Sequence, residues 1–322
     1  MNQWNREMAG MRCLYCYKEL SKGEVDFHSS CSKKMFGKAI APEFDYSQDD
    51  MLKLAEQFIK SQKSVTGVQA KLSLGIENIK GKDIPDRLTI VGLWGDYILK
   101  PQSDLYPALP ENEDLTMNLA GFAGIDTVKH SLIRLKSGEL AYITKREDRY
   151  SGGKLHMEDM CQLTDRLTEQ KYKGSYEQVA KVILKHSVNP LLDAINFYEQ
   201  VVFSFLTGNA DMHLKNFSLL QGTDQSYRLC PAYDLVSSEL VVEGDDEELA
   251  LNLNGKKKKL KRQDFEIAMA RAGIDGKAIQ NIFEKFRKLV PGWHEYIDIS
   301  FLPDELKLSY HGILEAKTAH VG

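Results

Sequence analysis

The stretch of sequence that most restricts the fold is residues 206–220, in which four residues separate Asp211 from Asn216. The largely apolar run 217–220 follows directly, and we expect it to form a buried strand. A loop with this spacing can present two polar side chains at one place and then return to the core. The spacing alone is a weak signal, because Asp and Asn also commonly cap turns.

A second acidic residue, Asp234, follows the strand-like segment 227–230. Protein kinases order their catalytic groups in this way, with an Asp that accepts the proton of the attacking hydroxyl, then an Asn and a second Asp that bind Mg²⁺. Asp211, Asn216 and Asp234 would form an oxygen-rich site suited to Mg²⁺ that bridges ATP phosphates. In the alternative interpretation, Asp234 caps a helix that begins at Leu235.

Four potential metal ligands lie close together near the N-terminus. Cys13 and Cys16 form a Cys-x2-Cys pair, and His28 and Cys31 form a His-x2-Cys pair. Two such pairs are typical of tetrahedral Zn²⁺ sites, and four protein ligands leave no open position for catalysis. We therefore predict structural zinc, which would supply the folding energy of a segment too small to bury its own core. The alternative is a set of free thiols with an incidental histidine.

Composition limits the class of protein. The 322 residues are 43% hydrophobic, which is enough for one large two-lobed domain or two domains. The net charge of −4 and the pI of about 6.1 give no overall attraction to nucleic acid or anionic membranes. No apolar run approaches the ~18 residues of a membrane span, and no secretory signal is recognisable. With five cysteines, an odd number, these features predict a cytoplasmic protein without membrane contact.

Several motifs together make the sequence similar to the HipA family of serine/threonine-kinase toxins. Segments 208–219 and 231–236 carry the strongest match, and the resemblance covers roughly residues 55 to 315. Further matches occur in the same order, at segments 64–71, 98–101, 111–113, 155–162 and 254–256. The resemblance implies an ATP- and Mg²⁺-dependent protein kinase that acts as the toxin of a type II toxin–antitoxin system. Known substrates in the family include aminoacyl-tRNA synthetases, whose phosphorylation stops translation.

The resemblance also implies a set of nucleotide contacts, from a loop over the phosphates, a strand-end lysine, a hinge that meets adenine, and the metal-binding loops. The residues are Thr66, Gly67, Val68, Gln69, Ala70, Lys71, Lys100, Lys145, Arg146, Glu147, His213, Asn216, Tyr233 and Asp234. The family has an aromatic residue at the position of Glu147, so stacking on adenine does not carry over to this chain.

Ser64 matches the serine that is an autophosphorylation site in the family, and Thr66 is a second candidate in the same loop. A phosphate adds about two negative charges where the phosphates of ATP would lie. We therefore expect modification of Ser64 or Thr66 to expel the loop and silence the enzyme. The alternative is an ordinary hydroxyl-rich turn.

Lys100 follows a predicted strand, and from a strand end its ammonium can reach the α- and β-phosphates. A glutamate near the start of the next helix can pair with this lysine, as in protein kinases. Glu113 is our first choice, and Glu111 stays open as an alternative.

These features predict an α+β protein with a two-lobed protein-kinase-like fold. We expect a zinc-ribbon-like element at residues 1–40, a small mixed N-lobe with the ATP loop at 41–150, and an all-helical C-lobe at 151–322.

Hydrophobic periodicity predicts particular elements within these regions. The predicted strand pairs are 87–91 with 96–99 and 132–135 with 140–143, and predicted helices include 112–124 and 157–163. In the helix at 112–124, we expect Leu115, Leu119 and Phe122 to form one buried stripe.

The resemblance implies partners. Full-length toxins of the family carry a further N-terminal subdomain before the ATP loop, whereas only about 63 residues precede Ser64 here. The chain therefore resembles the shorter, three-component branch, in which a separate small protein supplies that subdomain. A helix-turn-helix antitoxin is also expected, and DNA would be contacted only indirectly, through that antitoxin.

Two other functions stay open at this stage. One is a non-catalytic, pseudokinase-like subunit of a repressor complex, and the other is a small-molecule kinase on a related fold. The lysine-rich run 256–262 indicates either a solvated surface or contact with an RNA-bearing substrate.

Overall fold

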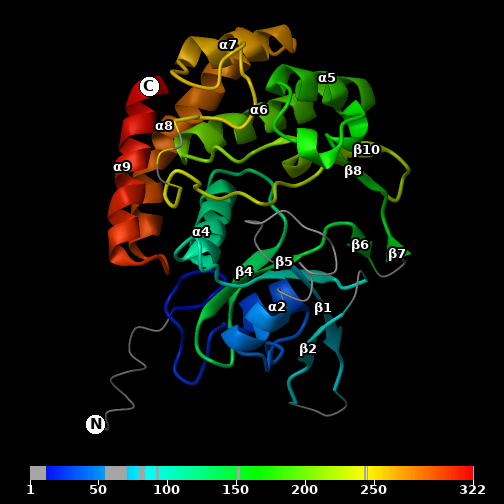
Figure 1. The fold of residues 1–322 in the computed structure, drawn as a ribbon, viewed down its shortest axis with the longest axis vertical. Helices are drawn as coiled ribbons and strands as arrows, with labels where there is room; N and C mark the ends of the chain where they lie inside the picture. Colours follow the sequence, from blue (N-terminus) through cyan, green and yellow to red (C-terminus); the bar gives the residue numbers. More distant parts are fainter. Residues whose placement is uncertain are drawn as a thin grey trace. The chain divides into compact units, whose positions relative to one another are not determined.

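The computed structural model describes residues 12–54, 71–79, 84–91, 94–150, 153–242, 244 and 246–321. The chain forms two compact units, one from residues 1–114 and 129–146 and the other from residues 115–128 and 147–322. The first unit contains the larger β-sheet, and the second contains most of the helices (Figure 1). The expected α+β class is confirmed.

In the described part of the first unit, the main sheet is antiparallel with the strand order β2-β1-β3-β5-β4. Its strands are β1 (Leu72–Glu77), β2 (Arg87–Ile90), β3 (Tyr97–Lys100), β4 (His130–Arg134) and β5 (Leu140–Lys145). The predicted hairpin of β4 with β5 is confirmed.

The predicted pairing of β2 with β3 is wrong, because β1 lies between them and pairs with both. Leu72 and Leu74 of β1 are fully buried, which suits a strand with a neighbour on each side. Gly95, just before β3, allows the close approach, since a Cβ atom there would lie only 2.5 Å from the carbonyl oxygen of Leu74.

The described residues of the first unit include helix α2 (Ser29–Phe36), a helical segment at 48–54 and the start of helix α4 (Leu109–Phe122). Helix α4 begins in the first unit and continues into the second. Leu115 and Leu119 are buried as predicted. The prediction for Phe122 is wrong, because its side chain is 47% exposed at the end of the helix, where its ring lies beside that of Tyr296.

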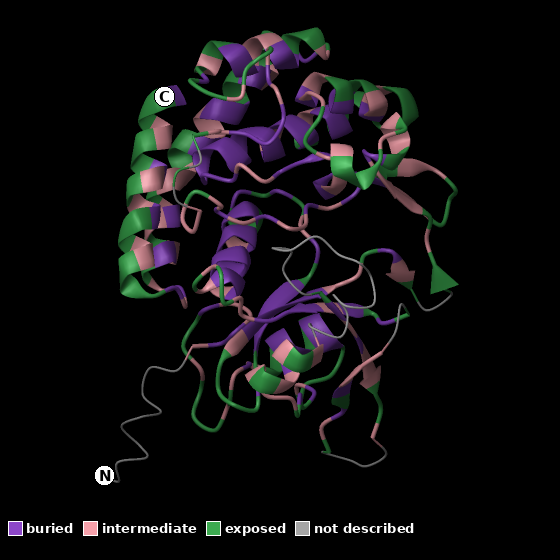
Figure 2. Cartoon of the chain, in the orientation of Figure 1, coloured by how far each residue is buried: buried purple, intermediate pink, exposed green. Residues whose placement is uncertain are grey.

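The helices of the second unit pack around a core that is densest along α6 (Figure 2). They are α5 (Tyr176–His186), α6 (Pro190–Leu206), α7 (Arg262–Arg271), α8 (Gly276–Asp298) and α9 (Asp304–Val321). Short 3₁₀ turns are η1 (Gln162–Thr164), η2 (Thr168–Gln170) and η3 (Leu214–Asn216), and a small hairpin joins β6 (Arg149–Tyr150) to β7 (Gly153–Lys154). No helix in the described parts of the chain is both long enough and apolar enough to cross a membrane.

The second unit is not all-helical, because it also holds a small sheet of order β10-β9-β8. The strands are β8 (Met157–Asp159), β9 (Ser218–Gln221) and β10 (Tyr227–Leu229). The helix predicted at 157–163 is therefore wrong. Pairing with β9, about sixty residues later in the chain, decides the conformation.

Candidate functional site

The loop that follows α6 brings Asp211 and Asn216 together. The side-chain amide of Asn216 donates a hydrogen bond to the carbonyl oxygen of Asp211 at 3.1 Å. The backbone N–H of Asp211 donates to Oδ1 of the buried Asn209, also at 3.1 Å. After η3 the chain enters β9, so the predicted loop and buried strand are both present.

Contacts with residues 238 and 239 hold the start of this loop. The N–H of Ala210 donates to Oγ of Ser238 at 2.8 Å, and the N–H of Glu239 donates to the carbonyl of Gly208 at 2.9 Å. Gly208 has a positive φ of 64°, and a Cβ atom there would lie 2.9 Å from Cβ of Glu239. Glycine is therefore required at this position on grounds of both conformation and space.

Tyr172 is a site residue that the sequence analysis missed. Its hydroxyl donates a hydrogen bond to Oδ1 of Asp211 at 2.5 Å, although the side chain is 42% exposed. The ring lies edge-on to His213, with centroids 5.0 Å apart. Tyr172 follows η2 in a turn-rich segment, where no spacing pattern points to a contact with a loop 39 residues away. The bond orients the carboxylate of Asp211.

Asp234 follows Tyr233, whose hydroxyl contacts residues before and after Asn216 in the sequence. The hydroxyl of Tyr233 donates to the carbonyl of Lys215 at 3.0 Å and lies 2.5 Å from Oγ of Ser218. Asp234 has a left-handed φ of 56°, which aspartate tolerates better than most residues. Residues 235–238 are not helical, so the interpretation of Asp234 as a helix cap is wrong. Asp211, Asn216 and Asp234 thus belong to two connected loops with the oxygen ligands that Mg²⁺ prefers.

His213 is buried, with 6% of its surface exposed, in the same loop. Its Nδ1 has no hydrogen-bond partner among the residues that the structure describes. Burial lowers the pKa of the imidazole from 6.5 to about 4, despite the opposing effect of the nearby Asp211. A neutral ring with an unused polar atom fits the nucleotide contact expected at this position.

We expect His213 to make the protein sensitive to acid. Because the pKa is lower in the folded chain, the unfolded chain binds more protons between pH 6.5 and pH 4. The contribution of neutral His213 to the free energy of unfolding is therefore complete above pH 6.5 and is lost as the pH falls towards 4. Between pH 6.5 and ~pH 5 the loss is about 2 kcal/mol. Urea unfolding at ~pH 7.5 and ~pH 5 should show a smaller loss for His213→Gln than for the wild type, and equal losses would contradict the prediction.

In the first unit, Lys100 pairs with Glu113. Nζ of Lys100 lies 2.5 Å from Oε1 of Glu113, and the two residues are only 3% and 2% exposed. Glu111 instead accepts a hydrogen bond from Nε2 of Gln102 at 2.8 Å, and burial raises the pKa of its carboxyl. Of the two glutamates left open by the sequence, the structure places Glu113 beside the lysine.

The structure describes only some of the other residues that were expected to contact the nucleotide. Ser64, Thr66, Gly67, Val68, Gln69 and Ala70 lie outside the described residues. Lys71 is exposed directly before β1. The N–H groups of Lys145 and Arg146 donate to the carbonyls of Lys129 and Asp96, each at 2.8 Å. Glu147 is the first residue of the chain segment that returns to the second unit, so the expected hinge coincides with a unit boundary.

The segment around β8 positions the loop through Asp159 and Met160. The Asp159 carboxylate lies 2.6 Å from Nζ of Lys215, and the N–H of Met160 donates to the carbonyls of Leu214 and Phe217. His156, in the matched segment 155–162, has its Nδ1 3.0 Å from the hydroxyl of Tyr227.

The lysine-rich run is paired with acidic residues of the same unit. Lys257 contacts Glu247 at 3.0 Å, and Lys258 contacts Asp246 at 2.5 Å. Opposite charges at this distance partly neutralise each other, which favours the interpretation as a solvated surface over RNA contact.

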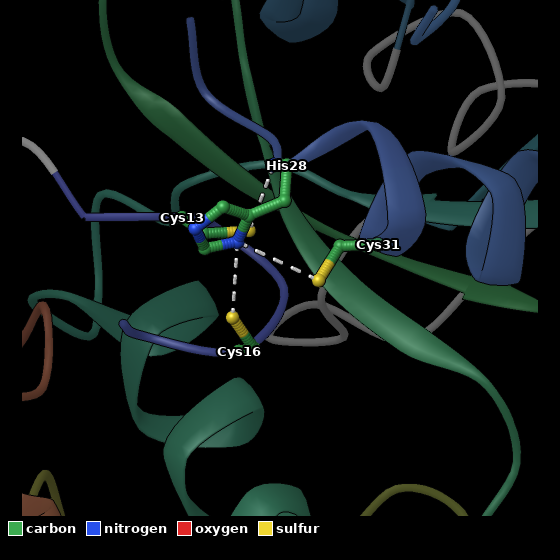
Figure 3. Close-up of side chains that lie close together, drawn as sticks. All are labelled: Cys13, Cys16, His28 and Cys31. Carbon is green, nitrogen blue, oxygen red and sulfur yellow. Dashed lines mark hydrogen bonds between the residues drawn. The ribbon is translucent and has the colours of Figure 1, made fainter. Parts of the chain in front are cut away.

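The four predicted metal ligands of the first unit meet at one point (Figure 3). Ligand atoms of Cys13, Cys16, His28 and Cys31 all lie within 4.8 Å of one another. Nδ1 of His28 faces two of the sulfurs, at 3.4 Å from Cys16 and 3.7 Å from Cys31. Its other nitrogen, Nε2, lies 2.9 Å from the carbonyl of Glu19, which orients the ring as an outer hydrogen bond does in metal sites. This donor set fits zinc.

Sequence comparisons extend over most of the chain. The family described as HipA-like C-terminal domain matches residues 63–293. The chain is 34% identical over 242 residues to putative kinase Y4dM of Sinorhizobium fredii, a match that covers 70% of this chain and 58% of that protein. It is 32% identical over 244 residues to a putative kinase of Haemophilus influenzae, covering 70% and 68% respectively. The match thus spans little more than half the length of the first relative.

Two solved structures resemble the fold. The Shewanella oneidensis MR-1 toxin–antitoxin complex of HipA, HipB and operator DNA matches with a TM-score of 0.69 and 20% identity, covering 94% of this chain and 80% of that chain. The proinflammatory kinase CtkA of Helicobacter pylori matches with a TM-score of 0.50 and 15% identity, covering 78% and 93%. These likenesses confirm the expected kinase-like fold.

Proposed function

Because this chain belongs to the family of proteins with a HipA-like C-terminal domain, we propose that it is an ATP-dependent serine/threonine protein kinase. The observation that carries the proposal is the connection between two loops, through which Tyr233 attaches the Asp234 segment to the residues that flank Asn216. A kinase needs its base and its two metal ligands on such loops. The buried pair of Lys100 with Glu113 supports the phosphate-binding role proposed for Lys100.

In this mechanism Asp211 orients the acceptor hydroxyl and accepts its proton. Tyr172 keeps one carboxylate oxygen in place and leaves the other for the acceptor. Asn216 and Asp234 would hold Mg²⁺, which neutralises charge on the phosphates when bound. Lys100 would contact the α- and β-phosphates. Residues 64–71, which match the family's ATP loop, would cover them.

We propose that the kinase is the toxin of a type II toxin–antitoxin system. The Shewanella relative of the same family is named a serine/threonine-protein kinase toxin, and the solved HipA complex contains HipB and operator DNA. A helix-turn-helix antitoxin would bind this chain and carry the DNA contact. An aminoacyl-tRNA synthetase is the proposed substrate, and phosphorylation of Ser64 or Thr66 is the proposed self-inhibition. The separate small protein that would supply an N-terminal subdomain stays a prediction.

The test is incubation of the purified chain with Mg²⁺ and ATP, followed by intact-mass measurement and phosphopeptide mapping. Phosphate on Ser64, Thr66 or an added synthetase, absent without Mg²⁺, is the expected result. Bound ATP without any transfer, even when the antitoxin has been removed, would favour the non-catalytic subunit. Transfer to metabolites alone would favour the small-molecule kinase.

We also propose that Cys13, Cys16, His28 and Cys31 bind a structural Zn²⁺ ion. The convergence of three sulfurs and one imidazole nitrogen supports this assignment. Four protein ligands would leave no position for a substrate, so the role would be structural.

A further inference from the structure

The metal-binding turn determines where Tyr17 lies. The N–H of Cys13 donates to the carbonyl of Lys18, and the N–H of Tyr17 donates to the carbonyl of Cys13, both at 2.9 Å. His28 donates its N–H to Sγ of Cys13 at 3.5 Å. Tyr17 follows Cys16 directly, and its side chain is 1% exposed. A change in the turn would therefore move a buried aromatic side chain.

Tyr17 contacts the first turns of α4 through a buried hydrogen bond. Its hydroxyl donates to Oδ2 of Asp114 at 2.7 Å, and the other oxygen of Asp114 lies 2.7 Å from Nδ1 of His130 on β4. Asp114 is fully buried and follows Glu113, the partner of Lys100. The metal-binding turn is thus joined, through the hydrogen bond from Tyr17 to Asp114, to the residue next to Glu113.

The same segment also contacts the sheet at two further places. The carbonyl of Leu14 accepts hydrogen bonds from the N–H of Leu132 at 3.2 Å and from Oγ of Ser131 at 3.0 Å. Near the C-terminal end of the segment, in α2, the carbonyl of Met35 accepts a hydrogen bond from the hydroxyl of Tyr97 of β3 at 3.2 Å. Tyr97 begins the strand that Lys100 ends. Both partners of the buried ion pair therefore lie on elements that the metal-binding segment contacts.

We infer that metal binding at the four ligands positions the Lys100–Glu113 pair, with Tyr17 as the connecting residue. When bound, the metal would keep the turn in the conformation that places Tyr17 against Asp114. Asp114 would then fix the start of α4 so that Glu113 lies beside Lys100. The inference rests on the proposed function only for the use of Lys100 in ATP binding. Loss of the metal is expected to loosen the nucleotide-binding unit without any change in the catalytic loop.

The experiment compares the wild type with Cys31→Ser, Tyr17→Phe and Tyr15→Phe. Zinc content is measured by atomic absorption, hydrogen exchange by mass spectrometry, and ATP affinity by calorimetry. Tyr17→Phe keeps all four ligands and removes the hydroxyl that reaches Asp114, so it tests the connection even where Cys31→Ser fails to fold. Tyr15→Phe is the matched control, because it removes a hydroxyl from the same turn and leaves the bond from Tyr17 intact.

We expect stoichiometric zinc in the wild type and in both tyrosine variants, and its loss in Cys31→Ser. Amide exchange in the first turns of α4 should rise at least about tenfold in Cys31→Ser and Tyr17→Phe. Amide exchange in β9 should not change in any variant. In α4, exchange in Tyr15→Phe should stay at the wild-type rate, unlike that in Cys31→Ser and Tyr17→Phe.

Two results would overturn the inference. One is a zinc-free wild type after expression with added zinc, and the other is unchanged exchange in α4 for Tyr17→Phe. ATP affinity separates this inference from the proposed function, and it should fall about fivefold in Tyr17→Phe. A wild type that binds no ATP while the exchange differences persist would refute the kinase proposal and leave the metal-dependent positioning of α4 standing.

Discussion

Replacement of Asp211 with asparagine is expected to lower the rate of phosphoryl transfer about 10³-fold. An amide cannot accept the proton of the acceptor hydroxyl at neutral pH, whereas it keeps the shape of the carboxylate. The hydroxyl of Tyr172 can still donate to the remaining side-chain oxygen at this position. The loop should therefore keep its fold. Incorporation of labelled phosphate into Ser64, Thr66 or a protein substrate measures the rate.

ATP affinity is the internal control for this variant, because the proposed ligands Asn216 and Asp234 are untouched. Asp224→Asn is the matched substitution elsewhere in the same unit, since Asp224 lies in the β9–β10 turn and pairs with Arg228 on the surface. It should transfer phosphate at the wild-type rate. An Asp211→Asn protein that retained a tenth of the wild-type rate would exclude Asp211 as the base.

The parts of the site that were predictable are those that local sequence encodes. The spacing of Asp211, Asn216 and Asp234, with the strands β9 and β10 between the loops, follows from residues that are neighbours along the chain. The two cysteine-containing pairs are local in the same sense, because Cys13 and Cys16 flank one turn and His28 and Cys31 lie at the start of α2. Their meeting at one point required only a short connection between them.

The parts that were missed depend on contacts between distant residues. Tyr172 reaches Asp211 across 39 residues, and β8 is a strand because its partner β9 lies about sixty residues later. The position of β1 between β2 and β3 likewise depends on which strand edges are available in the folded sheet. Hydrophobic periodicity does not contain this information, because it reports only which side of an element is buried.

The choice between Glu111 and Glu113 shows the limit most clearly. Two residues apart on an α-helix, their side chains point about 200° apart, so only one of them can face Lys100. Both lie in the first turns of α4, and both are largely buried. The rotation of the helix against β3 decides between them, and Gln102 provides the partner for the other.

Replacement of Lys100 with methionine is expected to destabilise the protein by about 3 kcal/mol and to remove most of its ATP binding. The methionine fills similar volume but leaves Glu113 as a buried carboxylate without the ammonium beside it. Breaking a buried pair on one side typically costs ~3–5 kcal/mol. Urea unfolding measures the stability, and calorimetry measures the ATP affinity.

The double substitution of Lys100→Met with Glu113→Gln separates folding from nucleotide binding. A neutral pair leaves no buried charge, so most of the lost stability should return. ATP affinity should not return, because no cation remains to contact the phosphates. Recovery of both quantities in the double variant would show that Lys100 serves only the packing of the sheet against α4. Recovery of stability alone would indicate that Lys100 contacts the nucleotide and that Glu113 holds the side chain of Lys100 in position.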